Sequence, residues 1–270
     1  MVGFASPVAA VRPGSAACPQ EPAPLPPWSL RCAAPPYDAL TDLPGEALPT
    51  LRRGSVVVVS AETAALGALA DVAAAAQAIR ARTPNPLVLC LGPALTPELL
   101  HLAAHAHSLG FSGVIPGAAP LGFALRTALT CPWALPERWV GWLRERSFAP
   151  VALEPVLLDL VRLAPHAADL PTLLRRLKIP ERTLSERLRR AALPKLERWY
   201  TATRLLHAEL ALQRQPHLPL RAASAELRYA DSYSFSNAFY RLFGITPSAS
   251  RRLLGLEWRL AAWFARSRRP

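Results

Sequence analysis

Residues 229–248 read YADSYSFSNAFYRLFGITPS, and this stretch decides how the C-terminal part of the chain folds. Asp231 is a good N-cap for a helix, because its carboxylate can accept hydrogen bonds from amides of the first turn. Four apolar residues follow at i, i+4, i+7 and i+8, namely Phe235, Phe239, Leu242 and Phe243. Gly244 can end the helix in the left-handed conformation. The pattern therefore predicts an amphipathic helix with one buried stripe and one polar face.

A shorter helix, with Leu220, Ala223, Ser224 and Leu227 as its inner face, precedes this one. The turn 228–231 joins the two. A similar pair spans 169–192, where Asp169 caps the first helix, 178–180 interrupts it and a second helix begins near Glu181. A longer helix over 196–213 connects the pairs. Two short helices joined by a tight turn are typical of a helix-turn-helix, in which the second helix enters the major groove.

Together these segments resemble the DNA-binding domains of AraC/XylS-type transcription regulators. Residues 229–248 look like the signature that ends those domains, written GFSxxSxFSRxFKRxFGxTPS. The segment Arg182–Leu188 is similar to the recognition helix of the first unit, and Arg204–Leu210 resembles the linker helix. The resemblance covers about 165–255. It implies an all-α domain with two helix-turn-helix units that reads two adjacent major grooves of double-stranded DNA.

The chain departs from the family at several positions. Lys178 and Arg228 stand in the two turns, where the family usually has glycine and the backbone tends to need a positive φ. A non-glycine residue in that conformation costs roughly 1 kcal/mol. Pro180 replaces the usual serine cap, and Ser224 an alanine. Two groove-facing positions that are often basic are Glu186 and Asn237. These changes put the DNA target and the affinity in doubt, but not the fold.

The resemblance assigns candidate roles to the polar side chains. The candidates for contacts with base edges are Arg182, Ser185, Glu186, Ser232, Tyr233, Ser236, Asn237 and Tyr240. The candidates for contacts with phosphates are Arg189, Arg190, Arg228, Arg241 and Arg251. Side chains that donate and accept hydrogen bonds suit base edges, whereas arginines on phosphates position the protein without specifying sequence.

The distribution of charge agrees with a polyanionic partner. The net charge of the 270 residues is +12, of which residues 1–150 contribute +1 and residues 151–270 contribute +11. A half that concentrates the excess charge is typical of nucleic-acid binding, although a generally basic protein gives the same total. Arg266, Arg268 and Arg269 lie in 256–270, interpreted as a basic tail that adds non-specific attraction at most.

Residues 28–130 alternate between strand and helix patterns. Short β-branched or aliphatic runs predict strands at Val56–Val59, Leu87–Leu91 and Gly113–Pro116. Helices are expected at Leu66–Arg82, from the Thr96 N-cap with Pro97 to about Leu109, and at Leu121–Leu129. Such alternation predicts an α/β domain with a small parallel sheet, receiver-like or flavodoxin-like.

This domain weakly resembles a response-regulator receiver. Ser60 stands where a receiver has its phosphoacceptor aspartate, and the carboxylate cluster that binds magnesium is absent. If the resemblance holds, the domain is a degenerate receiver. The alternative is a small α/β scaffold for dimerisation or ligand sensing.

The remaining segments complete the predicted organisation. Residues 1–27, rich in proline and alanine, predict a flexible tail, and 131–164 a linker whose tryptophans Trp133, Trp139 and Trp142 pack between domains. The four cysteines have no zinc spacing, and His101, His105 and His107 lack a carboxylate cluster, so no metal or cofactor is expected. No charge-free apolar window is long enough to span a membrane.

We therefore expect a cytoplasmic DNA-binding transcription regulator and not an enzyme, since no nucleophile–base pair or nucleotide-binding motif is recognisable. Double-stranded DNA is the expected partner, RNA polymerase a candidate second one, and a homodimer through the N-terminal domain a candidate assembly. Two alternatives stay open. One is a degenerate helix-turn-helix protein that acts through protein–protein contacts, and the other is an enzyme built on the α/β half.

Overall fold

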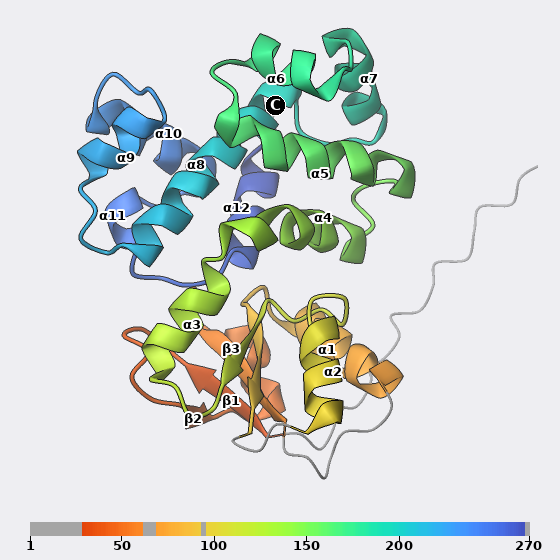
Figure 1. Cartoon of the computed structure of the whole chain (residues 1–270), viewed down its shortest axis with the longest axis vertical. Helices are drawn as coiled ribbons and strands as arrows, with labels where there is room; N and C mark the ends of the chain where they lie inside the picture. Colours follow the sequence, from red (N-terminus) through yellow and green to blue (C-terminus); the bar gives the residue numbers. More distant parts are fainter. Residues whose placement is uncertain (1–28, 62–68, 93–95, 268–270) are drawn as a thin grey trace, which may run out of the picture.

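The computed structural model describes residues 29–61, 69–92 and 96–267. The predicted tail 1–27, the first residues of the helix expected from Leu66, and Arg268 and Arg269 lie outside these residues. Figure 1 shows two lobes, an α/β lobe below and a helical lobe above, with α3 (Leu121–Leu129) rising between them.

The α/β lobe is built on a five-stranded sheet in the order β2-β1-β3-β4-β5. The strands are β1 (Leu30–Ala33), β2 (Thr41–Asp42), β3 (Val56–Ala61), β4 (Leu87–Leu91) and β5 (Gly113–Pro116). The three predicted strands, β3 to β5, run parallel as expected, but β1 runs antiparallel to both β2 and β3. The predicted parallel sheet is therefore confirmed for β3 to β5, but the sheet as a whole is mixed because of β1.

The sheet is covered on both faces, which explains the unbroken valine run of β3. Val57 and Val59 pack with residues of α1 (Leu69–Arg82) and α2 (Pro97–His105) in one core cluster. Val56 and Val58 pack with α3 in another. Because successive side chains of a strand point to opposite faces, a strand buried on both sides shows no polar alternation.

The local signals for α2 were mostly correct. Thr96 caps the helix, with its side-chain oxygen accepting from the amide of Leu99, and Pro97 is the first helical residue. The helix ends at His105 rather than near Leu109, and Gly110, with φ of +96°, follows in a turn. The strand order is one that doubly wound sheets use, but antiparallel β1 leaves the receiver-like fold unconfirmed.

The helical lobe comprises α4 to α12, and the described chain also has four short 3₁₀ segments. Its helices are α4 (Leu135–Glu145), α5 (Glu154–Leu163), α6 (Leu170–Leu177), α7 (Glu181–Arg190), α8 (Leu196–Arg214), α9 (Leu220–Glu226), α10 (Ser232–Phe243), α11 (Pro247–Ser250) and α12 (Glu257–Ser267). The 3₁₀ segments are η1 (Gly45–Thr50), η2 (Pro132–Ala134), η3 (Val151–Leu153) and η4 (Ala164–His166).

Helices α4 and α5 lie within 131–164, the segment predicted as a linker or interdomain helix, and their apolar residues belong to the core of the helical lobe. Trp139 is fully buried, stacks on Trp199 of α8 at 5.2 Å between ring centroids, and meets Trp263 edge-on at 4.9 Å. Aromatic pairs at such separations add to the free energy of burial. Trp133, by contrast, is 85% exposed and packs in neither lobe.

The predicted basic tail is instead helix α12, which packs inside the lobe. Leu256, Leu260, Trp263 and Phe264 are buried, and their spacing of four, three and one places them on one helical face. The arginines of the segment, interspersed among these apolar residues, are what suggested a basic tail. Even Arg259 is buried, where its Nη2 pairs with Glu209 of α8 at 2.5 Å.

The first residue of α12 fixes the two lobes to each other. Glu257 is buried and accepts hydrogen bonds from Arg138 Nη2 of α4 at 2.9 Å and from the Ser112 hydroxyl of the α/β lobe at 2.6 Å. Burial alone would raise the pKa of Glu257, but the positive charges of Arg138 and Arg80 outweigh it and lower the pKa to about 2. Glu257 is therefore ionised at neutral pH, with its Oε1 bound by both partners.

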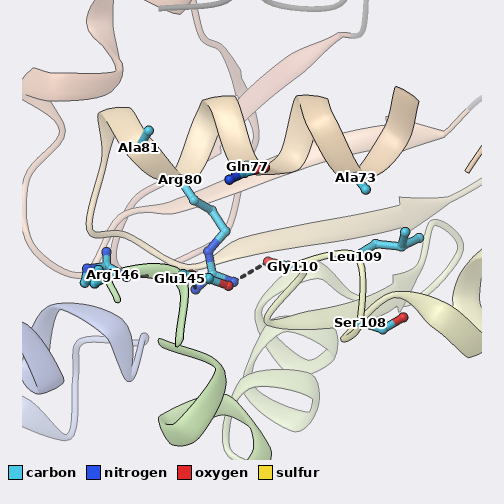
Figure 2. Close-up of a pocket in the computed structure, with 9 residues that line it drawn as sticks. All are labelled: Ala73, Gln77, Arg80, Ala81, Ser108, Leu109, Gly110, Glu145 and Arg146. Atoms are coloured by element: carbon cyan, nitrogen blue, oxygen red, sulfur yellow. Dashed lines mark hydrogen bonds and ion pairs between the residues drawn. The ribbon is translucent and has the colours of Figure 1, made fainter. Parts of the chain in front are cut away.

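Two further contacts cross the same seam. The amide of Leu254 donates to the hydroxyl of Tyr37 at 2.6 Å, and that hydroxyl donates to the carbonyl of Gly54 at 2.7 Å. On the opposite side, Arg80 of α1 pairs with Glu145 at the end of α4 at 2.7 Å and donates to the carbonyl of Gly110 (Figure 2). The lobes are thus joined by buried polar contacts as well as by packing.

Glu257→Gln is expected to lower the free energy of unfolding by about 3 kcal/mol, because it leaves the buried Arg138 without its counter-charge. The effect should be present above the unfolded-state carboxyl pKa of about 4.3 and diminish as the pH falls towards 2, since a lowered folded-state pKa stabilises only the ionised form. Urea unfolding followed by tryptophan fluorescence measures it. The exposed Glu197→Gln is the control, and equal losses for both variants would contradict the assignment.

Candidate nucleic-acid interface

The first helix pair, α6 and α7, forms with the caps expected from the sequence. The Asp169 carboxylate accepts from the amide of Thr172 at 2.8 Å and so begins α6. Lys178 ends it with φ of +53°, in the left-handed region that glycine normally occupies. Pro180 precedes α7 without a side-chain cap, as its chemistry requires. Leu184 and Leu188 of α7 face the core.

The second pair, α9 and α10, repeats this arrangement. The Asp231 carboxylate accepts from the amide of Ser234 at 2.6 Å, which confirms the predicted N-cap of α10. Arg228 in the turn has φ of +59°, and Gly244 ends α10 with φ of +72°. The predicted apolar stripe of α10 is buried. Both turns therefore adopt the positive φ expected from the departures in the sequence.

Helix α8 runs between the two pairs and braces both (Figure 1). Near its start, the hydroxyl of Tyr200 donates to the carbonyl of Ala167, just before the first pair, at 3.1 Å. One turn later, Arg204 donates to the carbonyl of Leu227, at the end of α9, at 2.6 Å and lies over the Tyr200 ring. Sequence reasoning missed this role of Arg204, although an arginine four residues after a tyrosine is a recognisable stacking signal.

The polar face of α7 is partly occupied by contacts within the helix itself. Arg182 is exposed, and Ser185 and Glu186 are half-buried. Glu186 accepts from Arg189 at 2.8 and 2.9 Å and from Arg190 at 2.8 Å. The hydrogen bonds from Arg189 and Arg190 lower the pKa of Glu186 to about 2. A predicted base contact thus binds two predicted phosphate contacts of the same helix.

The polar face of α10 is less engaged. Tyr233 and Tyr240 are 75% and 53% exposed. The Ser236 hydroxyl donates to the carbonyl of Ser232 at 2.7 Å, which uses its only proton. Asn237 is half-buried, and its side-chain amide makes no hydrogen bond with the described part of the chain. Asn237 therefore keeps its full capacity to donate to and accept from a base edge.

The remaining phosphate candidates lie around the second pair. Arg228 and Arg241 are exposed. Arg251, just after α11, is partly withdrawn because its Nη1 donates to the carbonyl of Pro216 at 2.8 Å. Arg187 and Arg221 are also exposed and basic, and the sequence analysis did not select them. None of these assignments is tested by the geometry of the chain alone, so the contacts with DNA stay predictions.

Comparison with known families supports the assignment of a helix-turn-helix domain to the C-terminal part of the chain. Residues 173–253 match a family model described as a helix-turn-helix domain, of the AraC type, which agrees with the resemblance read from the sequence. The match begins within α6 and runs to the segment after α11, so it covers most of the first helix pair and all of the second. A search of curated proteins and a search of solved structures each returned no match to the chain.

Other kinds of site receive no support within the described residues. His101 and His105 lie with ring centroids 4.4 Å apart, but this part of the chain holds no group of three or more potential metal-ligating side chains. Its three cysteines, Cys32, Cys90 and Cys131, are free thiols. Among the helices described, none has both the length and the apolar character needed to cross a membrane.

Glu186→Gln is expected to strengthen duplex binding and to steepen its salt dependence by about one unit in log Kd against log salt, because Arg189 and Arg190 become available to phosphates. Fluorescence anisotropy at several salt concentrations measures both. Glu181→Gln on the same helix is a matched control, since it removes the same charge from an exposed carboxylate. If the two variants change the slope equally, the contacts of Glu186 do not restrain the arginines.

Lys178→Gly should raise the free energy of unfolding by up to about 1 kcal/mol, because glycine adopts a positive φ without the steric cost that Lys178 bears. Thermal or urea denaturation measures the change. Lys195→Gly is the comparison, since Lys195 is the N-cap of α8 with φ of −59° and has no such strain to lose. A destabilised Lys178→Gly variant would show that the turn gains more from the lysine than the left-handed backbone costs.

Proposed function

We propose that the chain is a transcription regulator that binds double-stranded DNA with sequence specificity, placing α7 and α10 in two adjacent major grooves. The observation that carries the proposal is the duplicated geometry within 173–253. Each pair has a first helix, a left-handed turn and a second helix with a polar exposed face. A helix-turn-helix uses the second helix in this way.

The length of α8 supports the use of two grooves by one molecule. With 19 residues, α8 spans about 28 Å at 1.5 Å per residue. Successive major grooves on one face of B-DNA are about 34 Å apart. A helix of this length, braced to the first pair through Tyr200 and to the second through Arg204, holds the two pairs at a separation of the right order.

The two units are not equivalent in the proposed complex. In the first, the carboxylate of Glu186 offsets the charge of its neighbours Arg189 and Arg190. In the second, Asn237 and the two exposed tyrosines face outward without a competing acid on α10. We therefore assign most of the base reading to α10, and to α7 a smaller share through Arg182 and Ser185.

A second candidate function is a helix-turn-helix protein that acts through protein–protein contacts without specific DNA binding. The contacts of Glu186 are the observation in its favour, because they reduce the positive charge available to phosphates. The two functions differ in their salt dependence. Phosphate contacts give a steep loss of duplex affinity as salt rises, whereas protein contacts leave duplex binding weak at every salt concentration.

We propose that the α/β lobe senses a ligand or forms a homodimer, and that RNA polymerase is a second partner of the regulator. A degenerate receiver stays a hypothesis for the origin of this lobe. The free thiols of the described cysteines agree with a reducing, cytoplasmic location.

Selection of bound sequences from random duplexes with the full chain should yield a preferred site. At that site, Asn237→Ala is expected to cost about 1–3 kcal/mol and to relax the preference at one position, because it removes a bidentate partner for a base. Arg241→Ala should instead weaken binding to all duplexes alike. Gln77→Ala, an exposed amide in the α/β lobe, is the control. Equal affinity of the wild-type chain for every duplex would overturn the proposal of a specific regulator.

A further inference from the structure

Of the hollows described on the seam between the lobes, two differ clearly in the charge of their linings. The first, of about 460 Å³, is shown in Figure 2 and includes Arg80, Arg146 and Glu145 in its lining. Glu145 lies 2.7 Å from Arg80 and 3.6 Å from Arg146, so both arginines of this hollow already pair with a carboxylate of the protein. The positive charge of this hollow is therefore largely neutralised by Glu145.

The second hollow, of about 700 Å³, has arginines but no acidic residue in its lining. Its walls include Tyr37, Arg126, Pro216, Ser248, Arg251 and Arg252. Arg126 belongs to α3 of the α/β lobe, whereas Arg251 and Arg252 follow α11 of the helical lobe. The structure describes no ion pair of these three arginines with any carboxylate in residues 29–61, 69–92 or 96–267.

Two of the three arginines are held in place by neutral partners that leave their charge uncompensated. Arg126 Nη1 donates to the carbonyl of Gln213 at 2.9 Å, and Arg251 Nη1 donates to that of Pro216 at 2.8 Å. A guanidinium has five N–H donors, so most of each fork stays available. The buried Nε of Arg251 has no hydrogen-bond partner in the described structure. Three positive charges around one hollow without a counter-ion favour a bound anion.

We propose that this hollow binds a phosphate group and that the bound phosphate bridges the α/β lobe to the helical lobe. Guanidinium forks match the oxygens of phosphate in geometry and charge, and the Ser248 hydroxyl supplies a further donor. The phosphate comes either from a small phosphorylated molecule or from the DNA backbone. The DNA backbone as source rests on the proposed function, and so does any effect of a small phosphorylated molecule on DNA binding. Binding of the small molecule itself does not.

Because residues of both lobes line the hollow, a bound phosphate affects how the two lobes are arranged. A phosphate held by Arg126 and Arg252 ties α3 to the segment that follows α11, beside the second helix pair. Binding there therefore stabilises one arrangement of the two lobes by mass action, whatever the source of the phosphate.

The test uses the full chain and inorganic phosphate as the probe. Phosphate is expected to raise the Tm more than sodium chloride of equal ionic strength. Arg252→Gln, which removes a side chain without a hydrogen bond or ion pair in the described residues, should weaken the apparent phosphate affinity by about tenfold or more. Arg126→Gln should act similarly. The exposed Arg53→Gln in the α/β lobe is the matched control and should respond as the wild type does.

A second measurement separates the two sources. If the phosphate belongs to DNA, Arg252→Gln also weakens duplex binding and lowers the salt slope by about one unit, while Arg53→Gln does neither. If it belongs to a small molecule, Arg252→Gln weakens only the phosphate-dependent rise in Tm. The inference is overturned if Arg252→Gln and Arg126→Gln match Arg53→Gln in both measurements. Failure of the wild-type chain to bind any duplex would overturn the proposed function and leave the Tm measurement decisive for a small-molecule site.

Discussion

The buried carboxylate of Glu257 is the interaction on which the arrangement of the two lobes depends. It binds Arg138 of α4 and Ser112 of the α/β lobe, and it stands at the first residue of α12. Helix α12 packs between α4 and α10, so the position of the second helix pair relative to the sheet is set through this contact. Burying a carboxylate is unfavourable unless it is paired, and here the pairing is complete enough to keep its pKa low.

A second buried ion pair holds α11 and α12 to α8. Arg259 is buried against Glu209, and both contact the hydroxyl of Ser250, the last residue of α11. Burial is the main influence on Glu209 and raises its pKa, although Arg259 acts in the opposite direction. Both networks lie at the first turn of α12, one through Glu257 and the other through Arg259. The helical lobe is thus a larger unit than the two helix pairs, since α4, α5 and α12 complete its core.

Local signals predicted local structure well and long-range packing poorly. The caps Asp169, Thr96 and Asp231 and the three parallel strands follow from residue chemistry within a few positions, and each is confirmed. Strands β1 and β2 were missed because they are short and stabilised by pairing with β3 and with each other rather than by a sequence period. The sequence analysis interpreted α12 as a tail because arginines are interspersed among its apolar residues. Those apolar residues are buried by contacts with α4 and α8, which the local sequence does not encode.

The candidate site shows the same division. The sequence placed the polar faces of α7 and α10, but the hydrogen bonds of Glu186 and the support from Arg204 depend on rotamers and tertiary neighbours that spacing does not encode. The central claim is that one chain reads two adjacent grooves. Hydroxyl-radical footprinting of the full chain on its selected duplex tests this claim most directly. The account predicts two protected patches about 10 base pairs apart on one face of the duplex. A single protected patch, or uniform weak protection, would contradict it.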